Sequence, residues 1–308
     1  MQIALKHFSI VLKHCSIEAL KHSKIEALKH CNIEALKIAF LLIILLFTTN
    51  NNASAQTTDC IEQKISFNAG EKLEYKISYN WKAIWMGAGT VNFDISEETI
   101  NDRTVYHTRA IGKTFKRYEW FYKVHDVYES YIDKESLKPL RFDRDVNEGG
   151  YTKKLRYNFD HKNQNAHVDY FYRRGELKYE NKNVDINSCT HDMISAVYYT
   201  RNIDYNLLET NDTIPVEVIM DGATYPIYII YLGKEELKTD FGTFRCLKLK
   251  PALMDGYAFN EGDFMTIWAT DDDNRLPLLI ESPLKVGYAK ALLQDFENLR
   301  YDLSSKIE

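Results

Sequence analysis

The sequence predicts a mainly β protein: a single curved antiparallel β-sheet or open β-barrel with one helix in the middle of the chain. Three observations lead to this class. Apolar and polar residues alternate over short stretches, turn signals separate those stretches, and one segment instead carries apolar residues at helical spacing. The rest of the chain shows no comparable helical pattern.

The alternation is clearest in KLEYKISYN, where Leu73, Tyr75, Ile77 and Tyr79 face one way and polar residues face the other. A strand places successive side chains on opposite faces, so this stretch is typical of a half-buried strand. Similar patterns predict strands at residues 90–95, 103–110, 117–131, 153–160, 166–173, 215–220, 225–233, 243–250, 264–270, 276–281 and 285–295.

Glycine and asparagine residues mark the turns between these strands. Gly87 and Gly89 follow Trp85, residues 147–150 form a hairpin candidate, and an Asp-Gly pair at 221–222 joins two apolar runs. These signals predict antiparallel neighbours joined by short connections.

The exception is THDMISAVYYTR, which predicts a helix over residues 191–202. Met193, Ile194, Val197 and Tyr198 fall on one helical face. We expect Thr190 to cap this helix, with an aspartate in its first turn.

The first part of the chain has a different character. The phrase IEALK begins at Ile17, Ile25 and Ile33, and an eight-residue period fits no helical supercoil. Near-identical octads are typical of a short tandem DNA repeat, so we interpret residues 1–36 as translated upstream DNA. The alternative is a long basic leader region.

Residues 37–55 have the three parts of a secretory signal peptide. Lys37 precedes a ten-residue apolar run at 38–47, too short to span a bilayer, and Ala53-Ser54-Ala55 forms a small-x-small cleavage site. We therefore expect cleavage after Ala55, export to the periplasm, and a single β-rich domain over residues 56–308.

Charge and hydropathy argue against a nucleic-acid partner and against a transmembrane anchor. The whole chain carries a net charge of −5, and residues 56–308 are more acidic still. Binding to nucleic acid requires a basic surface, so a nucleic-acid partner is not expected. No second apolar run approaches the length of a bilayer span, so no transmembrane anchor is expected.

Three cysteines follow the predicted cleavage site: Cys60, Cys189 and Cys246. In an oxidising compartment two of them should pair, and three pairings are possible. Cys246 lies in FGTFRCLKLKP, which is typical of a strand interior, whereas the other two lie in loop-like surroundings. This contrast favours a disulfide between Cys60 and Cys189.

Five phrases in order resemble the bacterial exported family catalogued as domain of unknown function 3108. They are FNAGEKLEYKISYNW followed by GAGTV, DVYESYIDKESLKPLRFDRDVNEGGY, HDMISAVYYTR, FGTFRCLKLKP and IWATDDDNRLPLLIESPLKVGYAKALL, within about residues 66–295. The signal peptide and cysteines are similar to the Bacteroidetes-type form. The resemblance implies an exported β-rich protein and no activity. By fold-level analogy the pattern is similar to envelope lipoprotein carriers.

Motifs for catalysis or metal binding are not visible. Residues 271–274 lack the alternating ligands and distant glutamate of a calcium loop, so they predict a polar turn. His191 and Asp192 are interpreted as a surface histidine and a helix-capping residue. No nucleophile elbow, phosphate loop, HExxH or CxxC occurs. We expect no catalytic residue, no metal site and no cofactor.

The aromatic run FKRYEWFYKVHDVYESY carries the functional hypothesis. On a strand, Tyr118, Trp120 and Tyr122 would share one face, and with Trp81 and Trp85 they could line an apolar pocket. The alternative is an ordinary sheet core, which we favour for Trp120.

The sequence thus predicts a non-enzymatic periplasmic protein that binds or chaperones a lipid, another amphipathic ligand or an envelope component. An interaction or scaffold protein of the envelope without a ligand is the alternative, and an envelope hydrolase is less favoured.

Overall fold

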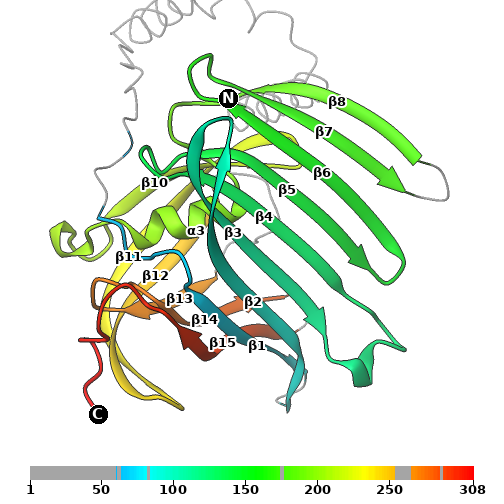
Figure 1. The fold of residues 1–308 in the computed structure, drawn as a ribbon. Coiled ribbons are helices and arrows are strands. Elements are labelled where there is room, and N and C mark those ends of the chain that lie inside the picture. Colours follow the sequence, from blue (N-terminus) through cyan, green and yellow to red (C-terminus); the bar gives the residue numbers. More distant parts are fainter. Residues whose placement is uncertain (1–59, 61–63, 82–83, 174–176, 254–264, 285–286) are drawn as a thin grey trace, which may run out of the picture. The chain divides into compact units, whose positions relative to one another are not determined.

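The computed structural model describes residues 60, 64–81, 84–173, 177–253, 265–284 and 287–308. They belong to the second of two units into which the chain divides, Thr57–Glu308. Within the described residues, fifteen strands form one sheet, which curves around a single α-helix (Figure 1). The predicted fold class is confirmed. No helix in these parts of the chain has the length and apolar character needed to cross a bilayer.

The sheet consists of two meanders joined through the first and last long strands. The first meander is β1 (Lys72–Trp81), β2 (Ile84–Ile100), β3 (Arg103–Thr114), β4 (His125–Asp133), β5 (Pro139–Glu148), β6 (Tyr151–Asp160), β7 (Asn165–Arg173) and β8 (Leu177–Asp185). The second is β9 (Thr190–His191), β10 (Thr213–Met220), β11 (Ala223–Thr239), β12 (Gly242–Leu253), β13 (Thr266–Thr270), β14 (Pro277–Pro283) and β15 (Tyr288–Glu297). β1 pairs with β15 in antiparallel register, and only the short β9–β10 pair is parallel.

The helix α3 (Met193–Arg201) lies between the two meanders and contacts β3, β4, β9 and β10. Ile194 and Tyr198 join the core of the first meander, whereas Tyr199 joins the core of the second. We call the sheet face that packs against α3 the inner face. Because α3 contributes to both cores, it covers apolar side chains of the inner face that neither meander could bury alone.

The predicted helix is present, but it spans Met193–Arg201 rather than 191–202, and its cap differs from the prediction. The cap is Asp192, not Thr190: its side chain accepts hydrogen bonds from the backbone N–H groups of Ile194 and Ser195. Thr190 belongs to β9, where it pairs with Glu217. A short 3₁₀-helix, η3 (Tyr205–Leu207), follows.

The connection between β10 and β11 links the second meander to the inner face of the first. Asp221 binds Arg144 on β5 at 3.1 Å and Lys153 on β6 at 2.5 Å. The neighbouring Gly222 N–H donates to the hydroxyl of Tyr157 at 3.3 Å. The predicted Asp-Gly turn is therefore confirmed, and it also joins the two halves of the sheet.

Two further local predictions are wrong. Gly87 and Gly89 lie inside β2 rather than in a turn, where the register places Ile77 opposite Gly89 and Ser78 opposite Gly87. The predicted strand 117–131 begins only at His125. Residues 115–124, which we call the covering segment, leave the sheet and contain the 3₁₀-helix η2 (Lys116–Tyr118).

Candidate ligand-binding site

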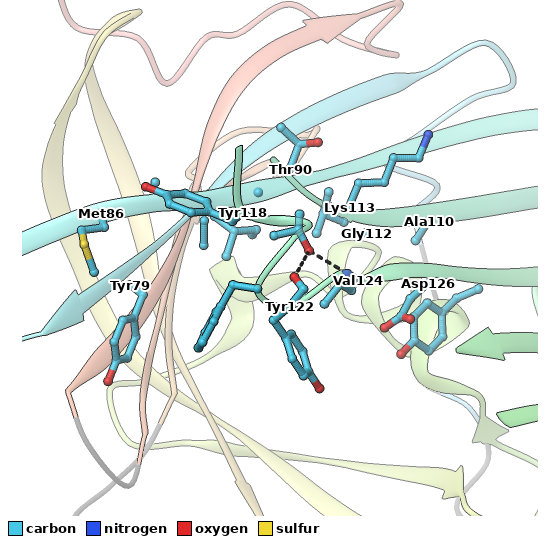
Figure 2. Close-up of a pocket in the computed structure, with 18 residues that line it drawn as sticks. Tyr79, Met86, Thr90, Ala110, Gly112, Lys113, Tyr118, Tyr122, Val124 and Asp126 are labelled. Atoms are coloured by element: carbon cyan, nitrogen blue, oxygen red, sulfur yellow. Dashed lines mark hydrogen bonds between the residues drawn. The ribbon is translucent and has the colours of Figure 1, made fainter. Parts of the chain in front are cut away.

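An apolar pocket of about 640 Å³ lies where β1, β2, β3 and β4 approach the covering segment (Figure 2). Its wall includes Ile77, Met86, Val91, Phe121 and Val124. Ligand pockets in proteins usually enclose about 300–1,000 Å³ and are mostly apolar. The size and lining of this pocket therefore suit a small apolar or amphipathic molecule.

Small residues create the space. Ala88 and Gly89 on β2 and Ala110 and Gly112 on β3 line the pocket and project little or nothing into it. A Cβ atom at Gly89 would lie 2.1 Å from the carbonyl oxygen of Lys113, so the close approach of β2 and β3 requires glycine there. At Gly112 a Cβ would meet only Val91, at 3.8 Å, so space above this residue remains open.

The covering segment is fixed by hydrogen bonds at both ends. Its first residue, Phe115, donates from its N–H to the carbonyl of Ala88 at 3.0 Å. The Thr114 hydroxyl accepts from the N–H of Val124 at 2.7 Å and donates to the carbonyl of Tyr122 at 3.2 Å (Figure 2). These bonds hold the aromatic residues of the segment beside the pocket.

The Tyr122 ring also packs over the hairpin between β5 and β6. It occupies the space that a Cβ at Gly149 would need, with the nearest ring carbon 2.5 Å from that position. Gly149 in turn donates its N–H to the carbonyl of Lys123 at 2.8 Å. The predicted hairpin at 147–150 is thus confirmed, and it supports the covering segment.

One wall of the pocket carries the carboxyl group of Asp126, which interacts with Glu148 outside the lining. Asp126 lines the pocket and is buried, and its carboxylate accepts a hydrogen bond from the Asn147 N–H at 2.9 Å. Burial, together with the hydrogen bond to Asp126, raises the pKa of Glu148, whereas the nearby Arg144 guanidinium opposes this shift. Tyr128 lines the same wall, and burial raises the pKa of its hydroxyl.

A second pocket of about 220 Å³ adjoins the first along the inner face. Both pockets are lined by Ile77 and Val91, and the second continues to Val197 and Tyr198 on α3. Its lining is also almost wholly apolar. The lining of the first space includes the covering segment, and the lining of the second includes the helix.

The five residues predicted to bind a ligand divide in the structure. Tyr118 and Tyr122 line the pocket. Trp85 lies outside its wall, 40% exposed, with the Lys290 ammonium 4.2 Å from its ring centroid. Trp120 is 84% exposed, so the expectation that it belongs to the core is wrong. Trp81 ends β1, and its side chain lies outside the described residues.

Sequence reasoning missed most of the pocket wall. The aromatic residues over 117–124 alternate as they would in a strand. The segment instead forms internal hydrogen bonds, such as that from the Tyr122 N–H to the Tyr118 carbonyl at 3.0 Å. Trp120 consequently points away from the sheet core. The useful signal was the sequence Gly87-Ala88-Gly89, because all three residues line the pocket and have little or no side chain to fill it.

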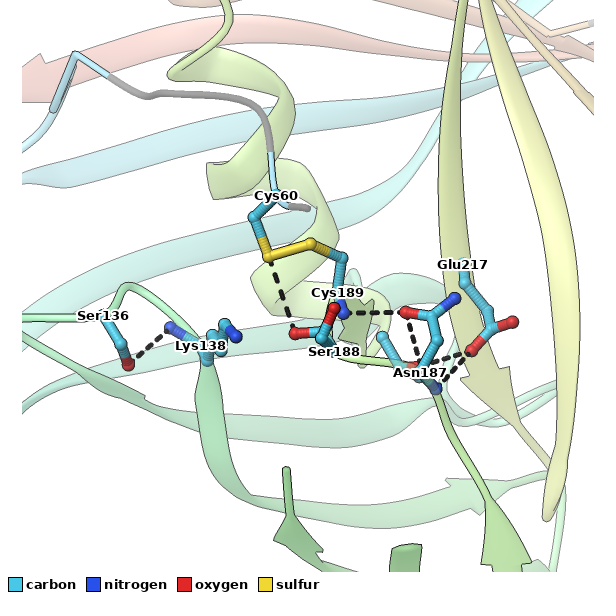
Figure 3. Close-up of a disulfide and its surroundings, with 8 residues drawn as sticks. Cys60, Ser136, Lys138, Asn187, Ser188, Cys189 and Glu217 are labelled. Carbon is cyan, nitrogen blue, oxygen red and sulfur yellow. Dashed lines mark hydrogen bonds between the residues drawn. A yellow bond between two sulfur atoms is a disulfide. The ribbon is translucent and has the colours of Figure 1, made fainter. Parts of the chain in front are cut away.

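The predicted disulfide between Cys60 and Cys189 is present (Figure 3). The two Cα atoms are 5.4 Å apart, a normal separation for a disulfide. The Cys189 N–H donates to the side chain of Asn187 at 2.7 Å, which fixes the loop before β9. Cys246 is free and buried within β12 as predicted, and burial raises the pKa of its thiol to about 12.

His191 is not the surface residue that the sequence suggested. It is 1% exposed, its ring lies 4.4 Å from that of Tyr199, and neither ring nitrogen has a hydrogen-bond partner. Burial lowers the pKa of His191 to about 3. Burial likewise raises the pKa of Asp192, although that carboxylate accepts hydrogen bonds from Ser130 and Ser195. Both residues serve the fold around α3.

The remaining acidic motif is a turn, as predicted. Residues 271–274 connect β13 to β14, and Asp272 accepts hydrogen bonds from the Thr270 hydroxyl and the Asn274 N–H. Among the residues that the structure describes, no group of three or more His, Cys, Asp or Glu side chains is arranged to hold a metal ion.

Comparison with known proteins gives a family but no activity. The model of the family described as "Protein of unknown function (DUF3108)" matches residues 74–294. No curated protein matches the chain.

Two solved structures are similar in part. One is a β-barrel-like protein of domain of unknown function DUF1849 from Brucella abortus, with 5% identity over 74% of this chain and 97% of that one and a TM-score of 0.48. The other is a protein with a YmcC-like fold from Bacteroides fragilis, with 8% identity over 77% and 99% and a TM-score of 0.28.

Proposed function

Because this chain belongs to the DUF3108 family, whose description assigns no activity, we propose a function from the site alone: the protein is an exported, non-enzymatic binder of an apolar or amphipathic ligand. The observation that carries the proposal is the apolar pocket of about 640 Å³ at the covering segment. Apolar ligand surface transferred into such a pocket gains roughly 25 cal/mol per Å².

The shape of the site favours a ligand with an alkyl chain. The second pocket shares Ile77 and Val91 with the first and reaches α3, so a chain that passes between these two residues could lie along the inner face. Lys113, which is exposed at the pocket, could meet a polar or anionic head group. A fatty acid or a lysophospholipid has both parts.

Binding is favoured over catalysis by the chemistry of the lining. Apart from tyrosines, its ionisable residues are Lys113 and Asp126, and the carboxylate of Asp126 is already hydrogen bonded to the backbone of the β5–β6 hairpin. No nucleophile with an adjacent base lies in the described part of this wall. An apolar site without such a pair suits a carrier or chaperone of a lipid or envelope component.

Export rests on the signal-peptide pattern of residues 37–55, and the disulfide between Cys60 and Cys189 suits an oxidising compartment. Mass spectrometry of the protein recovered from a periplasmic extract should give a chain that begins at Gln56. Recovery of a chain that retains residues 1–55 would contradict cleavage after Ala55.

The ligand proposal is tested by titration with a fluorescent fatty-acid analogue. Gly112→Phe should fill the pocket without strain, because the backbone there suits any residue and only Val91 is near. Phenylalanine is also favoured in strands. We expect the wild type to bind saturably and Gly112→Phe to lose at least tenfold in affinity while its unfolding midpoint is maintained.

Ile111→Phe is the matched control, because Ile111 neighbours Gly112 on β3 and faces the other side of the sheet. It should bind the probe as the wild type does. If the wild type shows no saturable binding of the probe or of extracted native lipid, the proposal fails, and a scaffold without a ligand takes its place.

A further inference from the structure

Exposed apolar side chains are concentrated at one end of the sheet. Because neighbouring strands are antiparallel, the β1–β2, β3–β4, β5–β6 and β14–β15 connections all lie at the end where the pocket opens, which we call the pocket end. Among the described residues, most of the exposed large apolar side chains are at this end, including Trp85, Met86, Trp120, Phe121, Leu284 and Tyr288. An exposed apolar group of this kind marks an interaction site.

These side chains lie on neighbouring strands and on the covering segment, and we call them the apolar border. Met86 and Phe121 line the same pocket from β2 and from the covering segment. Asn80 on β1 pairs with Trp85 on one side and with Tyr288 on the other. The apolar border therefore includes residues of β15 and β2, which lie on either side of β1, the residue that follows β14, and residues of the covering segment.

The covering segment and the residues that flank it, positions 113–125, carry a charge opposite to that of the whole protein. The whole chain carries a net charge of −5. From position 113 to position 125, four cationic residues stand against one acidic residue, namely Lys113, Lys116, Arg117, Lys123 and Glu119. All five side chains are exposed. A basic segment on an acidic protein predicts an anionic partner at this place.

We propose that the pocket end docks on the surface of an anionic phospholipid bilayer. Trp120 and Phe121, which are 84% and 79% exposed, would enter the head-group region, and Lys116 and Lys123 would meet lipid phosphates. Tryptophan is enriched at the membrane–water interface, and basic residues add affinity for anionic lipid. This inference goes beyond the proposed ligand, since docking would occur whether or not the pocket is filled.

The form of the segment favours a bilayer over a protein. Trp120 and Phe121 project from one short connection and contact each other at 5.9 Å between ring centroids. They have cations on both sides, at Lys116 and Lys123. Apolar residues at the tip with cations beside them match the layers of a membrane surface, where head-group charge lies outside the acyl chains. Docking in this orientation would place the mouth of the pocket against the lipid.

Vesicle flotation tests the electrostatic part. The purified protein, its N-terminus determined by mass spectrometry, is mixed with vesicles of phosphatidylcholine alone or with an equal part of phosphatidylglycerol. Wild type should prefer the anionic vesicles, and salt should weaken the binding. Lys116→Gln/Lys123→Gln should bind them roughly 30-fold more weakly. The control Lys162→Gln/Lys238→Gln, at the opposite end of the sheet, should bind as wild type.

The aromatic part is tested with Trp120→Ser, since Trp120 lies outside the pocket wall and its replacement should leave ligand binding intact. Affinity for anionic vesicles should fall roughly tenfold or more. The matched control is Leu207→Ser, an 81% exposed residue of η3 at the other end of the sheet. Every variant shares the same N-terminus, so differences among them report on the substituted residues.

Three results would overturn the proposal. The first is absence of wild-type binding to either vesicle, which would leave a protein partner for the pocket end. The second is equal affinity for neutral and anionic vesicles. The third is a loss in the controls as large as the loss in the covering-segment variants. Binding of the fatty-acid probe is measured in parallel, so failure of docking and failure of the ligand proposal are distinguishable.

Discussion

The guanidinium of Arg201 binds the carboxylate of Glu71 through two hydrogen bonds, of 2.6 and 2.9 Å, across 130 positions of the chain. Both side chains are buried, at 3% and 1% exposure. Burial alone would lower the pKa of Arg201, but attraction to the Glu71 carboxylate outweighs it and holds the pKa above its usual value. The pair fixes the last turn of α3 to the residue before β1.

Removal of one partner of this pair should be strongly destabilising. Glu71→Ala leaves the Arg201 charge buried and uncompensated, so we expect a loss of about 3–5 kcal/mol in the free energy of unfolding. The exposed Glu74→Ala on β1 is the control, with less than about 0.5 kcal/mol. Urea unfolding of both variants measures the difference, and equal effects would show that the pair contributes little.

Loss of the disulfide should destabilise the loop that leads into α3. Cys60→Ser and Cys189→Ser should each cost about 2–5 kcal/mol, and the double variant should be little worse, because all three remove one bond. Peptide mapping without reductant should find these two cysteines joined. A peptide that links either of them to Cys246 would overturn the assignment.

The buried histidine makes the fold sensitive to acid. The pKa of His191 is lowered to about 3, mainly by burial, with smaller contributions from the charges of His161 and Lys138. The unfolded chain, with an ordinary histidine pKa near 6.5, binds the proton first as pH falls. Stability should therefore be complete above about pH 6.5 and decrease toward pH 3, by at most about 1.4 kcal/mol per pH unit.

His191→Phe, which retains the packing on Tyr199, should flatten this dependence between pH 6.5 and 3. The exposed His125→Phe should follow the wild-type curve. Thermal unfolding over this pH range gives the comparison. Identical slopes for wild type and His191→Phe would show that other groups cause the acid sensitivity.

The exposure of Trp120 predicts a small effect on stability. Trp120→Ala should cost less than about 1 kcal/mol, because few packing contacts are lost. Phe142→Ala, at a residue 1% exposed in the core of the first meander, should cost about 3–5 kcal/mol. A loss of that size at Trp120 would show that the residue is buried in solution, which would contradict the structure.

The local patterns of the sequence predicted the local structure well. Period-two alternation identified β1, because in a half-buried strand the polarity of each residue indicates which face of the sheet it occupies. The Asp221-Gly222 turn and the helix at α3 followed from equally short-range signals. The contrast between loop and strand surroundings identified the cysteine pair. In each case the sequence signal lies within a few positions of the residues concerned.

The pocket and the apolar border were not predictable in the same way. The residues of the covering segment alternate as a strand would, yet they leave the sheet and place Trp120 in solvent. The wall combines β1 to β4, and its volume depends on how closely β2 and β3 approach at Gly89. No local sequence pattern indicates the distance between β2 and β3.

By itself, the sequence determined the β-rich class, the helix, the disulfide pair and the family, since these depend on local periodicity or on motifs read in order. The tertiary structure alone decided that Glu71 meets Arg201, that His191 is buried without a hydrogen-bond partner, and that small residues of β2 and β3 face a pocket. The physical reason is that these contacts join residues distant in the chain, and the curvature of the whole sheet sets their distances.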